Sequence, residues 1–284
     1  MSDPTLPPFD TAVVLGGGGV TGIAWEIGLL AGLLDEGIDL ADADIIIGTS
    51  AGAFAATFLA DHQVEEGFQR QFIPSIEDSI AMAPEVRNRY QAMIAAGNGD
   101  REQVGRNLGR LALETPTVSR DRRAEIVASR LATIEWPAGP LVVTAVDAET
   151  GALRLLERND GVDFLTAISA TGAVPGLWPA VELLGRQWID GGVTSSANPR
   201  LASSSRRAVV IAPSTNTFEG PDGFHLEVAR LRTNTEVESV VPDDASREAI
   251  GPNVFDAARR GVSAIEGRRQ GRLASKDVRR LLLI

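Results

Sequence analysis

The sequence predicts an α/β fold, a three-layer sandwich with a mostly parallel central sheet. Two apolar runs, at 11–15 and 45–47, have the length of buried strands, and a glycine-containing turn follows each of them. A helical pattern follows each turn, the first up to about residue 37 and the second up to about residue 60. This strand–helix–strand–helix order is typical of parallel strands joined by crossover helices, which lie on the faces of the sheet.

The rest of the chain divides into a polar helical stretch and a second group of strands. Charged and polar residues dominate from Asp61 to Trp136, so we expect a helical insert there that lies over the sheet as a layer or a lid. Further strands are expected at 141–146, 152–156, 181–184, 187–189 and 208–212. Further helices are expected at 85–95, 102–113, 122–134, 163–169 and 253–272. A single domain over 10–284 is predicted, with a flexible N-terminus at 1–9.

Charge and amino-acid usage exclude several functions. With 27 basic and 38 acidic side chains the net charge is −11, which repels nucleic-acid backbones. The chain has two histidines and no cysteine, so a thiolate site is excluded, a zinc site is disfavoured and no cofactor is expected. The longest uncharged apolar run, 45–60, is shorter than the roughly 18 residues of a membrane-spanning helix, and no targeting segment is evident. A cytoplasmic protein is predicted, with membrane contact at most peripheral.

The turn after the second strand is a G-x-S-x-G motif at 48–52, with Ser50 at its centre. A serine at a sharp strand-to-helix turn needs small neighbours, here Gly48 and Gly52, so that the chain folds back without a clash. Its hydroxyl then projects above the carboxyl edge of the sheet, where the next helix offers amide donors. The alternative is a structural turn in which Ser50 caps the helix. The buried strand before the turn favours a nucleophile.

The first turn contains a G-x-G-x-x-G pattern at 17–22, between a strand and a helix. One interpretation is the dinucleotide site of an oxidoreductase, but that site needs an acidic residue at the end of the second strand, and Asp44 precedes that strand. Another is an oxyanion hole made by the amides of residues 17–19, because adjacent parallel strands bring both turns to one edge of the sheet. A third is that the glycines only permit close packing. We favour the oxyanion hole.

Ser50 needs a proton acceptor, and three residues are candidates. His62 follows it by twelve residues, about 18 Å along a helix, and is expected at the far end of that helix. His225 lies in a loop-like region and would complete the chain order of an α/β-hydrolase triad, although such folds place several strands before the nucleophile. Asp190 is favoured, because an apolar strand leads into it and two glycines after it leave room for a ligand or another backbone segment.

The motifs stand in an order that resembles the patatin-like phospholipase family. They are the glycine loop at 17–22, the serine turn at 48–52 and the run Asp190-Gly191-Gly192. The stretch 169–179, SATGAVPGLWP, is similar to the Ser/Ala-x-Pro-x-x-aromatic-x-Pro block of that family. The resemblance spans about residues 12–214. It implies an α/β fold and a Ser–Asp dyad without a catalytic histidine.

The resemblance also assigns roles to residues. It implies that Ser50 is the nucleophile and Asp190 the proton acceptor. The oxyanion hole would be formed by Gly17, Gly18 and Gly19, and the supporting motif residues would be Gly22, Gly48, Gly52, Gly191 and Gly192. Thr21 stands where the family often has Lys or Arg, which removes a positive charge near the site and weakens the case for an anionic headgroup.

The predicted function is a serine acyl hydrolase that cleaves carboxylic ester bonds of lipids, phospholipids included, without a metal ion. The alternative is a catalytically weak or inactive lipid-binding or regulatory protein on the same fold, and the presence of both Ser50 and Asp190 favours the enzyme. A basic segment at 259–280 either lies on an anionic lipid surface or pairs its arginines with the acidic body. We favour the pairing. The number of subunits is left open.

Overall fold

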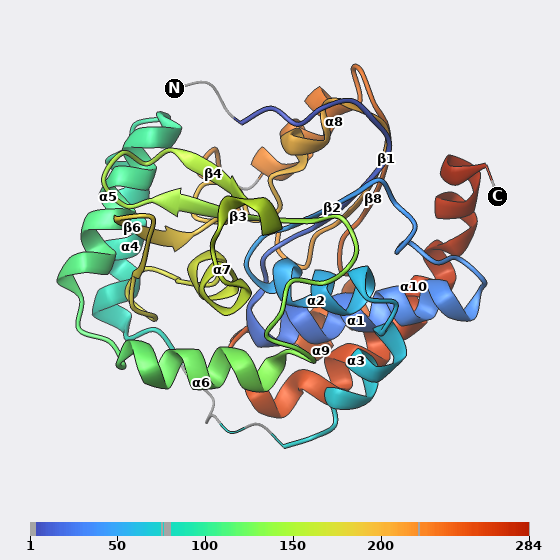
Figure 1. Ribbon diagram of the computed structural model, residues 1–284, viewed down its shortest axis with the longest axis horizontal. Coiled ribbons are helices and arrows are strands. Elements are labelled where there is room, and N and C mark those ends of the chain that lie inside the picture. The colour runs from blue at the N-terminus through green and yellow to red at the C-terminus, as the bar shows by residue number, and fades with distance from the viewer. Residues whose placement is uncertain (1–3, 75, 77–80, 221, 284) are drawn as a thin grey trace.

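The computed structural model describes residues 4–74, 76, 81–220 and 222–283. Within them, strands form one sheet in which each strand of the series β5-β6-β3-β2-β1-β7-β8 is hydrogen-bonded to the next, and β4 pairs with β3 (Figure 1). The strands are β1 (Phe9–Leu15), β2 (Ile45–Gly48), β3 (Leu141–Asp147), β4 (Leu153–Leu156), β5 (Val181–Leu183), β6 (Arg186–Asp190), β7 (Ser205–Ile211) and β8 (Glu236–Val240). Five of these described strands, β1, β2, β3, β7 and β8, pair in parallel, and β4, β5 and β6 pair antiparallel. The predicted fold class is confirmed.

Helices cover both faces of the sheet and complete three layers (Figure 1). The first face packs against α1 (Gly19–Asp35), α2 (Ala51–Ala60), α7 (Phe164–Thr171) and α10 (Arg260–Leu282). The second face packs against α5 (Arg101–Glu114), α8 (Gly223–Leu231) and the 3-10 turn η2 (Pro199–Ala202). In β1, Val13 and Leu15 contact the first core, whereas Ala12 and Val14 contact the second. A strand buried on both faces is apolar at every position, which explains why this strand could be predicted from the sequence.

The chain after α2 and before β3 consists of helices and loops in its described parts, with no strand among them. It forms α3 (Val64–Arg70), α4 (Pro84–Ala95), α5 and α6 (Arg120–Arg130). α3 packs beside α1 and α2, α6 packs on α7, and α4 lies on α5, which itself contacts β3 and β6. The polar stretch at 61–136 therefore contributes helices to both faces of the sheet.

Several boundaries differ from the expectations. The helix expected at 122–134 ends at Arg130, and the one expected at 253–272 begins only at Arg260, after the 3-10 turn η3 (Ala257–Arg259). The sequence did not indicate β8, α8 or α9 (Asp244–Ile250). β8 is an edge strand with polar residues at alternate positions, so it lacks the apolar run by which the central strands could be recognised.

The N-terminal segment packs against the rest of the protein from Leu6 onward. Residues 1–3 of the segment expected to be flexible lie outside the described residues. Phe9 already pairs with Ser205 in the sheet, and Leu6 packs against the core of the second face.

The arginines of α10 pair with acidic side chains of the body. Arg268 forms ion pairs with Asp35 at the end of α1 (2.6 Å) and with Glu65 of α3 (3.0 Å), and Arg269 pairs with Asp243 (2.6 Å). These contacts agree with the favoured interpretation of the basic segment. Among the helices of the described residues, none is both long enough and apolar enough to cross a bilayer.

α1 and α10 cross at a contact made of glycines. A methyl group at Gly28 or Gly32 of α1 would lie 2.1 Å from a backbone oxygen of α10, and one at Gly267 or Gly271 of α10 would lie 2.1 Å from a backbone oxygen of α1. The two backbones therefore touch directly, at a separation that larger side chains would increase. This contact holds the C-terminal helix against the helix that begins at the glycine loop.

We expect Gly271→Ala to destabilise the protein. Alanine normally stabilises a helix interior by up to about 1 kcal/mol relative to glycine. Here its Cβ would lie 2.1 Å from the carbonyl oxygen of Leu29, so α1 and α10 must separate, at a cost of about 1–3 kcal/mol. Urea denaturation measures the change. Lys276→Ala, on the exposed face of α10, is the control and should change stability by less than about 0.5 kcal/mol. A Gly271→Ala variant more stable than wild type would contradict the contact.

Candidate active site

The register of the sheet brings two strand ends together. Gly48, the last residue of β2, pairs with Val143 of β3, and Asp190, the last residue of β6, pairs with Ala145 of β3. β4 pairs with both of these β3 positions and therefore occupies the other edge of β3. β2 and β6 consequently lie on the same edge of β3 and run toward each other. Because their ends are only two residues apart along β3, the chain after β2 meets the end of β6.

Ser50 sits in a sharp turn between β2 and α2. Its backbone has φ 51° and ψ −119°, a positive φ that residues other than glycine rarely adopt. The turn is possible because its flanks are glycines. A Cβ on Gly52 would lie 2.1 Å from the carbonyl oxygen of Leu15, and one on Gly48 would lie 2.5 Å from the Cα of Ala53. The chain thus folds back on itself as the G-x-S-x-G motif predicted, and Ser50 is placed at the top of the turn.

Ser50 and Asp190 are hydrogen-bonded to each other. The Ser50 hydroxyl donates to Oδ2 of Asp190 over 2.6 Å, and the N–H of Gly192 donates to Oδ1 over 2.7 Å. After Asp190 the chain crosses closely over β3, since a Cβ on Gly191 would lie 2.0 Å from the Oγ1 of Thr144. The two glycines after Asp190 are therefore needed to turn the backbone toward Ser50.

The carboxyl group of Asp190 is a stronger base than an ordinary aspartate. Its side chain is only 5% exposed, and this burial raises the pKa of Asp190 to about 6. The hydrogen bonds from Ser50 and Gly192 and the positive charge of Arg123 oppose that rise. The group is therefore ionised above about pH 6 and is suited to take a proton near neutral pH.

The segment at 171–173, at the C-terminal end of α7, ties the two residues together through their backbones. The N–H of Ser50 donates to the Oγ1 of Thr171 over 2.8 Å, and the N–H of Asp190 donates to the carbonyl of Ala173 over 3.0 Å. Two residues of one short segment thus fix the positions of a turn and a strand end that are far apart in sequence.

Arg123 of α6 holds this segment from behind. Its side chain is 3% exposed, donates to the carbonyl of Gly172 over 3.1 Å and places its guanidinium 4.1 Å from the ring centre of Trp178. Trp178 belongs to the block at 169–179 that the sequence singled out. Buried contacts therefore hold Arg123 in the position from which its positive charge lowers the pKa of Asp190.

The glycine loop lies against Ser50 but does not offer all the expected donors. A Cβ on Gly17 would lie 3.3 Å from the Cβ of Ser50, so the loop and the serine turn are neighbours. The N–H of Gly17, however, donates to the carbonyl of Ser196 over 2.6 Å, and we correct its expected role as an oxyanion donor. The N–H groups of Gly18 and Gly19 donate to no acceptor within the described residues.

The shape of this loop is set by close packing and by one buried acid. A Cβ on Gly18 would lie 2.6 Å from Pro213, and one on Gly22 would lie 3.2 Å from the same residue. Glu26 of α1 is fully buried and accepts the N–H of Gly16 over 2.9 Å. Burial raises the pKa of Glu26 well above its usual value, and the hydrogen bond from Gly16 opposes that rise.

Thr21, for which the resemblance described above would lead one to expect Lys or Arg, is also buried. Its N–H and its hydroxyl both donate to the carbonyl of Val254, over 3.1 and 3.3 Å. Thr21 therefore joins the glycine loop to the segment before α10.

Both histidines lie away from the site. His62 is exposed at the end of α2, and its Nδ1 lies 3.1 Å from Asp39. His225 is exposed on α8, which corrects the expected loop, and its ring contacts Phe224. Neither makes a hydrogen bond to Ser50 or Asp190 within the described residues, so the triad alternative has no support in this structure.

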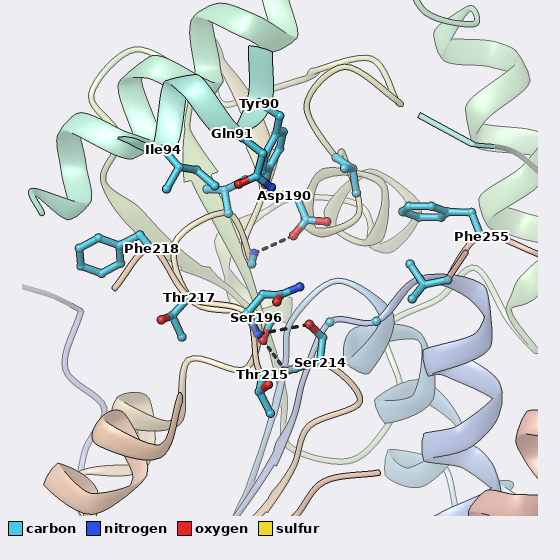
Figure 2. Close-up of a pocket in the computed structure, with 18 of the residues that line it drawn as sticks. Tyr90, Gln91, Ile94, Asp190, Ser196, Ser214, Thr215, Thr217, Phe218 and Phe255 are labelled. Atoms are coloured by element: carbon cyan, nitrogen blue, oxygen red, sulfur yellow. Dashed lines mark hydrogen bonds between the residues drawn. The ribbon is translucent and has the colours of Figure 1, made fainter. Parts of the chain in front are cut away.

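A cavity of about 590 Å³ opens over Asp190 and the glycine loop. Figure 2 shows Tyr90, Gln91 and Ile94 of α4 on one side of Asp190, and Phe218 and Phe255 at opposite ends. Partial removal from water at the cavity wall and the negative charge of Asp190 raise the pKa of Tyr90, which keeps its hydroxyl neutral. Asp190 thus faces a space that is large enough for part of a lipid and that is bounded by apolar groups at both ends.

Comparison with known proteins identifies the family. The family model of the patatin-like phospholipases matches residues 13–202, about two thirds of the chain. The chain belongs to the patatin-like phospholipase family. The match includes Ser50 and Asp190 and ends before α8, so α10 lies outside it. No curated protein matches the chain.

Two solved structures are similar to this chain at low identity. VipD from Legionella pneumophila is 13% identical with a TM-score of 0.39, over 95% of this chain and 68% of that one. ExoU from Pseudomonas aeruginosa is 14% identical with a TM-score of 0.42, over 96% of this chain and 54% of that one. The chain thus spans about half the length of ExoU.

Sequence reasoning missed three residues of the site: Thr171, Arg123 and Glu26. Thr171 lies inside the block at 169–179, but nothing in the sequence indicates that its hydroxyl accepts from Ser50. Arg123 and Glu26 each lie on a helix, where their burial depends on the packing of distant segments. No group of three or more His, Cys, Asp or Glu that could hold a metal ion occurs within the described residues.

The stability of the Asp190→Asn variant relative to wild type is expected to rise with pH. In wild type the pKa of Asp190 is higher in the folded state than in the unfolded state. Its contribution to the free energy of unfolding is therefore full below about pH 4 and is lost as the pH rises through about 6. The variant carries no such group, so its advantage over wild type should be about 1 kcal/mol larger at pH 8 than at pH 5.5. Urea denaturation at both pH values measures it. Asp163→Asn, at the exposed N-cap of α7, is the control. An equal difference at both pH values would contradict the burial of an ionised Asp190.

Proposed function

We propose that this protein is a serine acyl hydrolase that cleaves carboxylic ester bonds of lipids with a Ser50–Asp190 dyad. The observation that carries the proposal is the 2.6 Å hydrogen bond from the Ser50 hydroxyl to Asp190, whose side chain lines a cavity with apolar groups at both ends. Membership of the patatin-like phospholipase family supports the lipid substrate.

In the first step Ser50 Oγ attacks the ester carbonyl while its proton passes to Oδ2 of Asp190. The carbonyl oxygen becomes an anion, and the N–H groups of Gly18 and Gly19 are the donors that we assign to it. Loss of one such donor typically costs about 10²–10³ in rate. Asp190 then gives the proton to the departing alcohol oxygen, which leaves an acyl group on Ser50.

In the second step water replaces the alcohol. Asp190, ionised again, takes a proton from water as its oxygen attacks the acyl carbonyl, and the same amides hold the second oxyanion. The proton returns to Ser50 Oγ as the fatty acid departs. The bonds and protons of both steps balance without a metal ion or a cofactor. The lid role expected for the insert stays a prediction.

The first test is turnover of p-nitrophenyl esters. Ser50→Ala removes the attacking oxygen and is expected to lower kcat/KM by about 10⁴-fold or more, and Asp190→Asn by about 10²–10⁴-fold. His225→Ala is the control and should keep full activity, because that side chain is exposed on α8. Full activity in Asp190→Asn with loss in His225→Ala would restore the triad alternative. An inactive wild type would favour the lipid-binding alternative.

The pH dependence of kcat/KM is expected to report Asp190. The base must be ionised, so kcat/KM should rise tenfold per pH unit below about pH 6 and level above it. A histidine base would titrate in the same range, since its ordinary pKa is about 6.5. The profile is therefore repeated on a variant with both His62→Ala and His225→Ala. Disappearance of the acid limb in that variant would rule out Asp190 as its source.

A further inference from the structure

The cavity over Asp190 and the glycine loop has an unusual charge pattern, because its walls carry one charged side chain, that of Asp190, and no positive charge among the described residues. The ten residues outside the described ranges include no lysine, arginine or histidine either, so they add no cation to the wall. A phosphate group in this cavity would meet a carboxylate without a compensating cation.

The arginines nearest to the wall are engaged in other contacts. Arg101 donates to Glu227 over 3.2 Å and lies over the ring of Phe218, and its own side chain does not line the cavity. Arg123 is 3% exposed and is held behind Trp178. Arginine is the usual partner of phosphate oxygens, and neither of these side chains is positioned to serve as one from inside the cavity.

The polar part of the wall is instead a strip of neutral hydrogen-bonding groups, formed by Ser196 and residues 214–217, Ser-Thr-Asn-Thr. We call it the hydroxyl strip. Backbone bonds fix it, since the N–H of Ser196 donates to the carbonyl of Asn216 and the N–H of Phe218 donates to that of Thr194, each over 3.0 Å. Figure 2 shows Ser196, Ser214 and Thr215 on the opposite side of Asp190 from α4.

We propose that the lipid cleaved here has an uncharged polyol headgroup, glycerol or a sugar, and that the hydroxyl strip binds it. The inference rests on the proposed function and names its substrate class. The hydroxyls of Ser196 and Thr217 already donate to backbone carbonyls, so they offer their oxygens as acceptors. The Thr215 hydroxyl and the Asn216 amide can both donate to and accept from sugar or glycerol hydroxyls. The apolar ends of the cavity take the acyl chain. The net charge of −11 acts in the same direction, since it disfavours approach to an anionic lipid surface.

The test compares lipids that share one acyl chain. Oleoyl glycerol, oleoyl lysophosphatidylglycerol and a monogalactosyl oleoyl glycerol are presented in neutral detergent micelles. We expect kcat/KM for at least one uncharged lipid to exceed that for the phosphate lipid tenfold or more. The first and third lipids distinguish a glycerol site from a sugar site. Equal or higher kcat/KM on the phosphate lipid would overturn the inference.

A charge introduced into the strip provides the matched variant. Asn216→Lys places a cation in the strip and is expected to reduce the preference for the uncharged lipid at least threefold. Asn234→Lys adds the same charge in the exposed turn after α8 and is expected to leave the preference unchanged. An equal effect of both variants would attribute the preference to overall charge and would overturn the role of the strip.

Two further measurements separate this inference from the proposed function. If p-nitrophenyl butyrate is hydrolysed while the phosphate lipid is preferred, the headgroup inference fails and the hydrolase stands. If no ester is hydrolysed, the hydrolase fails, and binding of the same three lipid micelles to Ser50→Ala decides the headgroup. Tighter binding of an uncharged lipid supports the strip, and equal or tighter binding of the phosphate lipid overturns it.

Discussion

The site depends on one feature of the sheet, the shared edge of β3. β2 and β6 pair with this edge from opposite directions, and their ends lie two residues apart. Ser50 and Asp190 are 140 positions apart in sequence, yet the register of a single strand places them in hydrogen-bond contact. A pair set by backbone register is held far more rigidly than one on two loops, which suits a proton transfer that requires contact within about 3 Å.

This arrangement has a cost in stability, and the cost is concentrated at the site. Ser50 has a positive φ, Asp190 is buried and ionised at neutral pH, and Glu26 is buried beneath the glycine loop. Strained and desolvated groups of this kind persist only where the surrounding structure fixes them. The segment at 171–173, held by Arg123, performs that task for the dyad, and the glycine contact between α1 and α10 supports the helix that carries the loop.

The sequence was sufficient for the parts of the site that depend on local geometry. The turn at Ser50 needs glycines at fixed spacing, the turn after Asp190 needs two more, and apolar runs lead into both. These requirements are visible as motifs. The occupied N–H of Gly17 could not be predicted, because its acceptor, Ser196, lies far along the chain and belongs to no motif. Arg123 and Thr171 were missed for the same reason, since their roles exist only once α6 and α7 are packed. At the level of the fold, β8 was missed because an edge strand carries little apolar pattern.

The wall of the cavity that α4 forms is the most exposed one, and the pattern of apolar residues in the sequence indicates least about it. α4 has no buried residue, yet Tyr90 and Ile94 face the cavity from it. Its attachments are the contact with α5, including the hydrogen bond from Asn107 to the carbonyl of Met93, and the exposed ion pair of Arg89 with Glu114. Exposed pairs contribute about 1 kcal/mol or less, so α4 is held more weakly than the sheet beneath it. The dyad and the hydroxyl strip are therefore fixed by backbone bonds, whereas the α4 side of the cavity is held by weaker contacts.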